Sequence, residues 1–383
     1  MDAAIAGLGL TEMGRVYGRT TSEFAADAVL AALGDAGLER DQLDGLLVSS
    51  GVTHGVDLSL ARQLGLEDLG LLAEVNAYGA TASAMLAYAA LAVGAGMATA
   101  VACVWADAPL TPGAATGAAY GGLRLDGLAS LTASAGLFGA PRTYALAARR
   151  HMERYGTTSE QLGSVAVQTR AWATMNPLAQ MRDPIALADH QASRMIAEPL
   201  HLLDCCLVSN GGVAVIVTSA ERAADLAQPP VHVLGLGQSH PGYTMDASSR
   251  FGLVTGARRS GEQAMRMAGV TTADVDVCEL YDCFTFTTLI TLEDYGFCAK
   301  GEGGAFVESG VLGPGGALPT NTGGGQLSGY YMWGMTPLSE AVIQARGQAG
   351  ERQVDKHDVV LVSGNGGTLD HHGTIVLSPH AHA

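Results

Sequence analysis

Three segments in the second half of the chain carry the residue types that could do chemistry. They read CELYDCFTFT from Cys278 to Thr287, LPTNTGGGQLSGYYMWGM from Leu318 to Met335, and SGNGGTLDHHG from Ser363 to Gly373. Each follows or ends an expected strand, and a doubly wound α/β sheet places its ligand sites at such strand ends. Their side chains offer phenols, amides and two adjacent histidines.

The familiar signatures of covalent, phosphate and metal chemistry are missing from the sequence. It contains no G-x-S-x-G elbow, no P-loop, no H-E-x-x-H and no C-x-x-C motif. The six cysteines show no ligand-like spacing, so neither a zinc site nor a disulfide framework is expected. Two Gly-Leu-Gly sequences do not fit a dinucleotide fingerprint, and we expect their glycines to turn the chain at a strand end.

The composition excludes several classes of protein. Of the 383 residues, 48% are apolar and 15% charged, which is typical of a globular protein rather than a disordered or coiled-coil one. A net charge of −16 and 5% aromatic residues argue against nucleic acid and anionic membranes as partners. The uncharged stretch Val75–Ala106 indicates a helix buried on all sides and a strand, with a membrane span as the less favoured alternative. The N-terminus lacks a basic region, so we expect no signal peptide and a cytoplasmic protein.

The elements that must position the three segments occur twice along the chain. Each copy begins with a strand, continues with a helix that ends at an Ala-Gly cap and an acidic turn, and later adds a second helix and strand. The matching ranges are Ala3–Gly9 and Val231–Gly237, Ser22–Ala36 and Ser260–Ala268, Gly79–Gly96 and Met335–Arg346, and Ala98–Val104 and Val359–Ser363.

This duplication predicts two similar α/β halves, at residues 1–225 and 226–383. An insertion at about 109–200, rich in glycine and then helical, is expected to form a cap over the active site. No low-complexity linker separates the halves, so we expect one compact unit.

Several further segments carry a family resemblance. They are HMERYGTTSEQLGSVAVQTR, EPLHLLDCC, the N-x-x-G-G loop and GNGGTLDHHG. Together with the repeat and the cap, they resemble the thiolase superfamily over nearly the whole chain, in the lipid-transfer (sterol-carrier-protein-associated) branch. The resemblance implies a duplicated five-layered αβαβα fold, a homodimer, and an acyl-CoA whose thioester lies between the two halves.

The resemblance breaks at the catalytic positions of thiolases. The position of the family's nucleophilic cysteine corresponds to Gly79, and no cysteine lies near it. Tyr281 takes the place of the histidine in the His-Asp-x-Phe motif, and Tyr331 that of the histidine in the Gly-His-Pro motif. The terminal loop, where thiolases hold a base, reads Asn-Gly-Gly from Asn365. A Claisen reaction through an acyl-cysteine is therefore not expected.

The pattern is instead similar to the thiolase-like steroid side-chain aldolases, through Y-D-x-F-T, N-T-x-G-G-Q-L and the tyrosine ahead of W-G-M. That resemblance implies retro-aldol cleavage of a tertiary β-hydroxyacyl-CoA into a 17-ketosteroid and propionyl-CoA. It also implies a small zinc-ribbon/OB-fold partner protein, with zinc in that partner and no cofactor or metal in this chain. The reaction needs a base for the hydroxyl proton, stabilisation of a thioester enolate, and an acid for its carbon. Tyrosine can donate to an enolate in its ordinary state, but as a base it would need its pKa of ~10 lowered.

We expect Tyr281 and Tyr331 to divide the roles of acid and base, with the assignment left open. Packing or turn formation remains the alternative for the other candidates, and two adjacent histidines on a strand face opposite sides, so at most one points inward. Arginines of the cap are expected to meet the CoA phosphates. The expected substrate and oxyanion pocket comprises Gly79, Asn321, Gly324, Gly325, Tyr330 and His372, and the cap arginines are Arg149, Arg150, Arg154, Arg182 and Arg194.

Two other functions stay open at this point. The chain could be a thiolase-like acyl-CoA enzyme acting on an aromatic or branched substrate. It could also be a non-catalytic subunit that binds lipids or acyl-CoA. Degenerate sites usually fill with unrelated residues, so the two phenols at former catalytic positions favour the aldolase.

Overall fold

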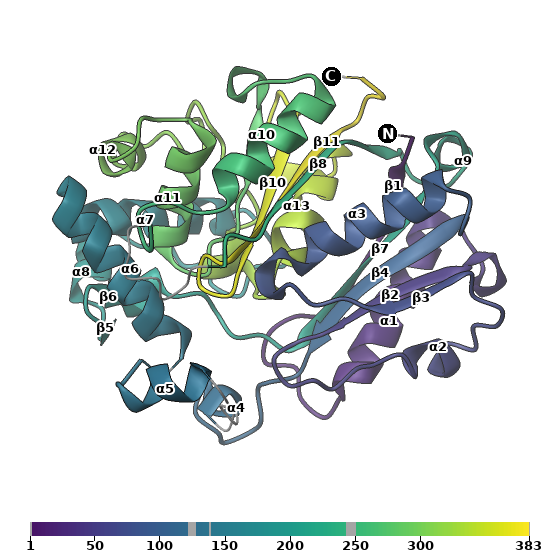
Figure 1. Cartoon of the computed structure of the whole chain (residues 1–383), viewed down its shortest axis with the longest axis horizontal. Helices are drawn as coiled ribbons and strands as arrows, with labels where there is room; N and C mark the ends of the chain where they lie inside the picture. The colour runs from purple at the N-terminus through teal and green to yellow at the C-terminus, as the bar shows by residue number, and fades with distance from the viewer. Residues whose placement is uncertain (1, 122–127, 138, 243–249, 383) are drawn as a thin grey trace.

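The computed structural model describes residues 2–121, 128–137, 139–242 and 250–382 (Figure 1). One sheet of nine strands runs through the molecule in the order β3-β2-β4-β7-β1-β8-β11-β10-β9. Its first five strands precede residue 225 and its last four follow it. The strands are β1 (Ala4–Leu10), β2 (Gly45–Ser50), β3 (Leu71–Glu74), β4 (Ala100–Asp107), β7 (Gly211–Thr218), β8 (Val231–Ser239), β9 (Val277–Glu279), β10 (Val360–Gly366) and β11 (His371–Ser378).

The two strand sets share one pairing pattern. In the first set β2 is parallel to β4, β4 antiparallel to β7, and β7 antiparallel to β1. In the second set β9 is parallel to β10, β10 antiparallel to β11, and β11 antiparallel to β8. A short antiparallel pairing of β1 with β8 joins the sets. The repeated strand–helix pattern of the sequence predicts this kind of internal symmetry.

Helices on both faces of the strand sets produce five layers. Outside the first set, α1 (Thr21–Ala36) contacts β1, β4 and β7, and outside the second, α10 (Ala257–Ala268) contacts β8 and β11. Between the sets, α3 (Thr81–Gly94) and α13 (Met335–Ala345) contact strands of both (Figure 1). The expected αβαβα layering is confirmed. Two short helices, α2 (Leu60–Gln63) and α9 (Ala220–Ala224), complete the first half.

The insertion between β4 and β7 lies beside the second half of the chain (Figure 1). Its longest helices are α6 and α7, and α7 contacts α11 (Thr285–Tyr295) and α12 (Gly303–Glu308). A capping box between Thr158 and Gln161 starts α7. The insertion comprises α4 (Ala118–Gly121), α5 (Leu128–Ser134), α6 (Ala140–Tyr155), α7 (Ser159–Thr174), α8 (Leu187–Ala192), β5 (Met195–Ala197) and β6 (Leu200–His201).

The glycines of the two Gly-Leu-Gly sequences lie inside β1 and β8 and make room for helices. A Cβ atom at Gly9 would overlap the Ala28 carbonyl oxygen in α1, and a Cβ atom at Gly237 would overlap the Ser260 carbonyl oxygen in α10. The prediction that these glycines turn the chain at a strand end is therefore wrong. They are small because the helix backbones approach the strands so closely.

The uncharged helix α3 is buried on one side only. Met85 and Leu86 are fully buried, whereas Tyr88 is 39% and Leu91 64% exposed. The prediction of burial on all sides is therefore wrong for one apolar face. Within the described part of the chain, no helix combines the length and the apolar character needed to cross a bilayer.

Candidate active site

The structure brings Tyr281 and Tyr331 together from positions fifty residues apart. Tyr281 follows β9, and Tyr331 follows a π-helical turn at Gly325–Gly329 that leads toward α13. Their hydroxyl oxygens lie 3.3 Å apart, within hydrogen-bonding range. Tyr281 is 4% exposed, and Tyr331 is half-buried. The two phenols that replace the thiolase histidines therefore occupy one site.

Gly79 lies directly against this site, at the turn before α3. A Cβ atom at Gly79 would overlap both the ring of Tyr281 and the carbonyl oxygen of Asn365. The Tyr281 ring thus occupies space that a side chain at position 79 would need. Glycine at the former cysteine position is therefore a packing requirement of the phenol that replaced the histidine.

A buried carboxyl connects the backbone segments of the two phenols. Asp282 directly follows Tyr281, and its oxygens accept hydrogen bonds from the N–H groups of Gln326 at 2.7 Å and Leu327 at 3.4 Å. Gly325 has a φ of 54°, and a Cβ atom there would overlap the carboxyl of Asp282. The turn before Tyr331 is therefore built around Asp282.

Asn321 holds the start of the same loop, and its place in the substrate pocket remains a prediction. Its Oδ1 accepts a hydrogen bond of 2.6 Å from the Leu280 N–H, and its own N–H donates to the Cys278 carbonyl. The N–H of Gly324 donates to the Asn321 carbonyl at 2.9 Å. The role of oxyanion donor expected for Gly324 therefore does not fit, because the turn already uses that N–H.

The cap supports the loop from its other side. The Arg170 Nε in α7 donates to the Ser328 hydroxyl at 2.8 Å, and the Asn176 Nδ2 donates to the Gly323 carbonyl at 2.7 Å. Arg170 is 7% exposed and Asn176 1% exposed. Buried hydrogen bonds therefore join the cap to the loop next to Tyr331.

The cap arginines expected at the CoA phosphates have mixed partners. Arg149 forms surface ion pairs with Glu153 and Glu198, and the Arg150 guanidinium donates to the Phe251 carbonyl. Phosphate contacts by any of the five arginines remain a prediction.

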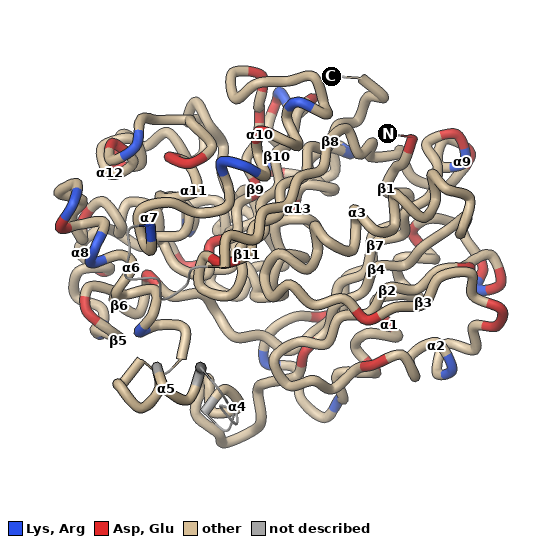
Figure 2. Tube along the Cα trace, viewed as in Figure 1, with Lys and Arg blue, Asp and Glu red and all other residues tan. Residues whose placement is uncertain are grey.

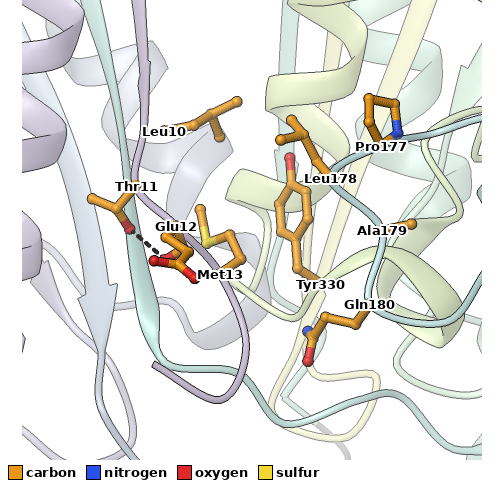
Figure 3. Close-up of a pocket in the computed structure, with 9 residues that line it drawn as sticks. All are labelled: Leu10, Thr11, Glu12, Met13, Pro177, Leu178, Ala179, Gln180 and Tyr330. Atoms are coloured by element: carbon orange, nitrogen blue, oxygen red, sulfur yellow. Dashed lines mark hydrogen bonds between the residues drawn. The ribbon is translucent and has the colours of Figure 1, made fainter. Parts of the chain in front are cut away.

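Tyr330 points away from the phenol pair, as expected for the neighbour of Tyr331 in an extended backbone. Its hydroxyl lies 2.7 Å from the Ser339 hydroxyl. Its ring lines a separate cavity of about 270 Å³ between the end of β1 and the segment around Gln180 (Figure 3). The expected place of Tyr330 in the same pocket as the pair is therefore not supported.

The two adjacent histidines face opposite sides of β11, as predicted. His372 is fully buried, and its Nε2 lies 3.1 Å from the hydroxyl of Tyr295 in α11. Burial lowers the pKa of His372 to about 3, so its ring is neutral at physiological pH. His371 lies on the other side, where its ring stacks on Tyr78 and its Nδ1 is 3.0 Å from the Nδ1 of His240. Neither arrangement indicates a proton shuttle to the phenol pair.

Two tyrosines of the cap that the sequence does not single out contribute to the site: Tyr144 beside Asn365, and Tyr120, whose phenol is close enough to reinforce the effect of burial in raising the pKa of Tyr331. The hydroxyl of Tyr144 in α6 accepts a 3.2 Å hydrogen bond from the Asn365 Nδ2. The hydroxyl of Tyr120 in α4 is buried and has no hydrogen-bond partner among the described residues. One signal in the sequence could have pointed to them: tyrosines in a glycine-rich insertion are unusual in a chain with only 5% aromatic residues.

All of these phenols are protonated at neutral pH. Burial, and next the neighbouring Tyr331, raises the pKa of Tyr281 well above 10, and burial followed by the Cys206 thiol raises that of Tyr331. Burial raises the pKa of Tyr144 in the same way. The lowered pKa that a free phenolate base requires is therefore not provided. The pair can donate hydrogen bonds and pass protons along.

Within the described residues, no group of three or more histidine, cysteine, aspartate or glutamate side chains is arranged to hold a metal ion.

Comparisons with known proteins identify the family of the chain. Residues 237–379 match the family model of the thiolase C-terminal domain. The chain is 40% identical over 375 residues to a steroid side-chain-cleaving aldolase of Thermomonospora curvata, covering 95% of both chains. It is 38% identical over 385 residues to the 17-hydroxy-3-oxo-4-pregnene-20-carboxyl-CoA lyase of Mycobacterium tuberculosis, covering 95% of this chain and 97% of that one.

Two solved structures show the same fold. An aldolase described as Ltp2-ChsH2(DUF35) superposes with a TM-score of 0.87 at 38% identity, covering 98% of this chain and 97% of that one. A monomeric SCP2-thiolase-like protein from Mycobacterium smegmatis superposes with a TM-score of 0.77 at 20% identity, covering 99% of this chain and 77% of that one. Given relatives this similar along nearly its whole length, the chain belongs to the thiolase superfamily, in the branch of the steroid side-chain-cleaving aldolases.

Proposed function

We propose that the chain is a carbon–carbon lyase that cleaves a bulky, steroid-type β-hydroxyacyl-CoA into a ketone and a short acyl-CoA such as propionyl-CoA. The observation that carries the proposal is the protonated phenol pair, 3.3 Å apart, beside a glycine at the former nucleophile position. The named activities of the two curated relatives support the same reaction class. Coenzyme A enters as part of the substrate.

The phenol pair can perform this reaction without a nucleophile. The bond between the carbinol carbon and the α-carbon breaks, the carbinol becomes a ketone, and the electron pair passes to the thioester as an enolate. One proton must leave the hydroxyl and one must reach the α-carbon. If Tyr331 accepts the first while passing its own proton to Tyr281, and Tyr281 protonates the enolate carbon, the pair ends as it began.

This relay explains why neither phenol needs a lowered pKa. A free phenolate in so buried a site would be costly, since burial raises the pKa of both groups. When each phenol gives up its proton as it receives another, neither becomes a phenolate. We place Tyr331 at the hydroxyl and Tyr281 at the enolate because Tyr331 is the more exposed of the two.

We further propose a homodimer that works with a DUF35-type partner carrying zinc. The neighbouring structure that pairs Ltp2 with ChsH2(DUF35) supports the partner. The exposed apolar face of α3 supports the dimer.

The test is to incubate the chain, alone and with such a partner, with a tertiary steroidal β-hydroxyacyl-CoA and to measure ketone release. Tyr281→Phe and Tyr331→Phe should each lower kcat by roughly 10²-fold or more, with binding of the CoA ester retained. Tyr155→Phe, at the other end of α6 from Tyr144, controls for the loss of a phenol. Tight binding without cleavage by the unaltered chain would favour the carrier function, and full activity of both variants would refute the relay.

A further inference from the structure

The oxyanion of the proposed reaction needs hydrogen-bond donors, and the N–H of Gly324 is not free to be one. Retro-aldol cleavage develops negative charge on the thioester oxygen, and aligned hydrogen-bond donors stabilise such charge. The Gly324 N–H already donates within its own turn. A side chain close to the phenol pair can supply the donor that Gly324 does not.

Tyr144 is placed to be that donor. Its ring packs on Phe284, three residues after Tyr281, with centroids 4.7 Å apart. Its hydroxyl accepts a hydrogen bond from the side chain of Asn365. Asn365 and Tyr281 both border Gly79, because a Cβ atom there would overlap the Asn365 carbonyl oxygen and the Tyr281 ring. Tyr144 is 4% exposed, and its pKa, raised first by burial, keeps it a donor at neutral pH.

Asn365 fixes the direction in which this phenol donates. Its Nδ2 donates to the Tyr144 oxygen at 3.2 Å and so occupies a lone pair of that oxygen. The Tyr144 proton therefore points elsewhere, and in the chain without substrate it meets the thiol of Cys283. A bound thioester oxygen would replace that thiol as the acceptor. The Oδ1 of the same amide has no hydrogen-bond partner among the described residues. Water cannot easily satisfy it either, because Asn365 is only 1% exposed. A fixed donor beside a free buried acceptor is a pattern that a ligand bearing both groups completes.

We propose that Tyr144, reaching in from the cap, donates a hydrogen bond to the thioester oxygen of the acyl-CoA as the enolate forms, and that Asn365 is the positioning residue that aims it. The inference rests on the proposed function and assigns a third phenol to it. It also gives the cap a chemical role, because α6 then carries a group that touches the reacting thioester.

Two measurements on the full chain with its partner test the proposal. The first is kcat for ketone release. The second is deuterium exchange at the α-carbon of propionyl-CoA in heavy water in the presence of the ketone product, which passes through the same enolate and gives the relay its second proton acceptor. Tyr144→Phe should lower both rates by roughly 10²-fold, with binding of propionyl-CoA changed less than about threefold. Asn365→Ala should lower both by roughly tenfold, and Tyr155→Phe on the same helix should change neither.

The double variant decides how Asn365 acts. If Asn365 works through Tyr144, combining the two substitutions should cost no more than Tyr144→Phe alone. Additive losses would overturn the positioning role, and unchanged rates in Tyr144→Phe would overturn the donor role. Failure of the unaltered chain to release ketone would instead count against the proposed function, so the two failures are distinguishable.

Discussion

At the level of single residues, the carboxyl of Asp282 governs how the two phenols meet. It is fully buried and holds the turn before Tyr331 through the Gln326 and Leu327 N–H groups. Burial raises its pKa from 3.8 to about 7, although those hydrogen bonds favour the charged form. The folded chain therefore holds this proton more tightly than the unfolded chain does.

A pH-dependent stability follows from that difference. The contribution of Asp282 to the free energy of unfolding is fully present below the unfolded pKa of 3.8 and is lost as the pH rises through about 7. This linkage lowers the free energy of unfolding by about 3 kcal/mol between pH 4 and 7, and we expect Asp282→Asn to remove that decline. Urea unfolding of both chains across that range measures it. Parallel pH profiles of the two chains would contradict the raised pKa.

At the level of elements, the start of α3 and the end of β10 meet at Gly79, so this glycine tests how tightly the site is packed. Gly79→Ala places a methyl group against Tyr281 and Asn365. We expect a loss of about 1–3 kcal/mol in unfolding free energy. We also expect a fall in kcat of roughly tenfold or more as the phenol is displaced.

Gly94, at the other end of α3, provides the matched control. A Cβ atom there would meet nothing within 4 Å. Gly94→Ala should therefore raise the free energy of unfolding by up to about 1 kcal/mol and leave kcat unchanged. If Gly79→Ala behaved like this control, the close packing of Tyr281 on Gly79 would be disproved.

The sequence predicts the elements well because the strand–helix order is local and repeated. The observed β1, α1, α10, α13 and β10 all overlap their expected ranges. The sequence could predict that Tyr281 and Tyr331 meet, because both follow predicted strands or loops of the second half. The pairing of Tyr144 with Asn365 was not, because it joins residues 221 positions apart through the docking of the cap. No periodicity along the chain encodes such a contact.

At the scale of the whole molecule, charge and apolar surface are unevenly distributed. The net charge is −16, yet the trace of α3 carries no charged residue (Figure 2). Its exposed face carries large apolar side chains, including Tyr88 at 39% and Leu91 at 64% exposure, and Met97, just after the helix, is 52% exposed. Strand β3, whose Leu71 shares a hydrophobic cluster with α3, forms one edge of the sheet. An open strand edge beside an apolar helix face is suited to a second copy of the chain, which would cover both.

Leu91→Asp should therefore convert a dimer into a monomer, since each two-fold related interface would bury two unpaired carboxylates. Light scattering coupled to size-exclusion chromatography measures the mass directly. Leu131→Asp is the matched control, because Leu131 in α5 is 66% exposed but lies in the cap, away from α3. It should leave the mass unchanged. A dimer that survives Leu91→Asp would mean that the copies associate through another face, and a monomeric unaltered chain would mean that the apolar face of α3 serves a different partner.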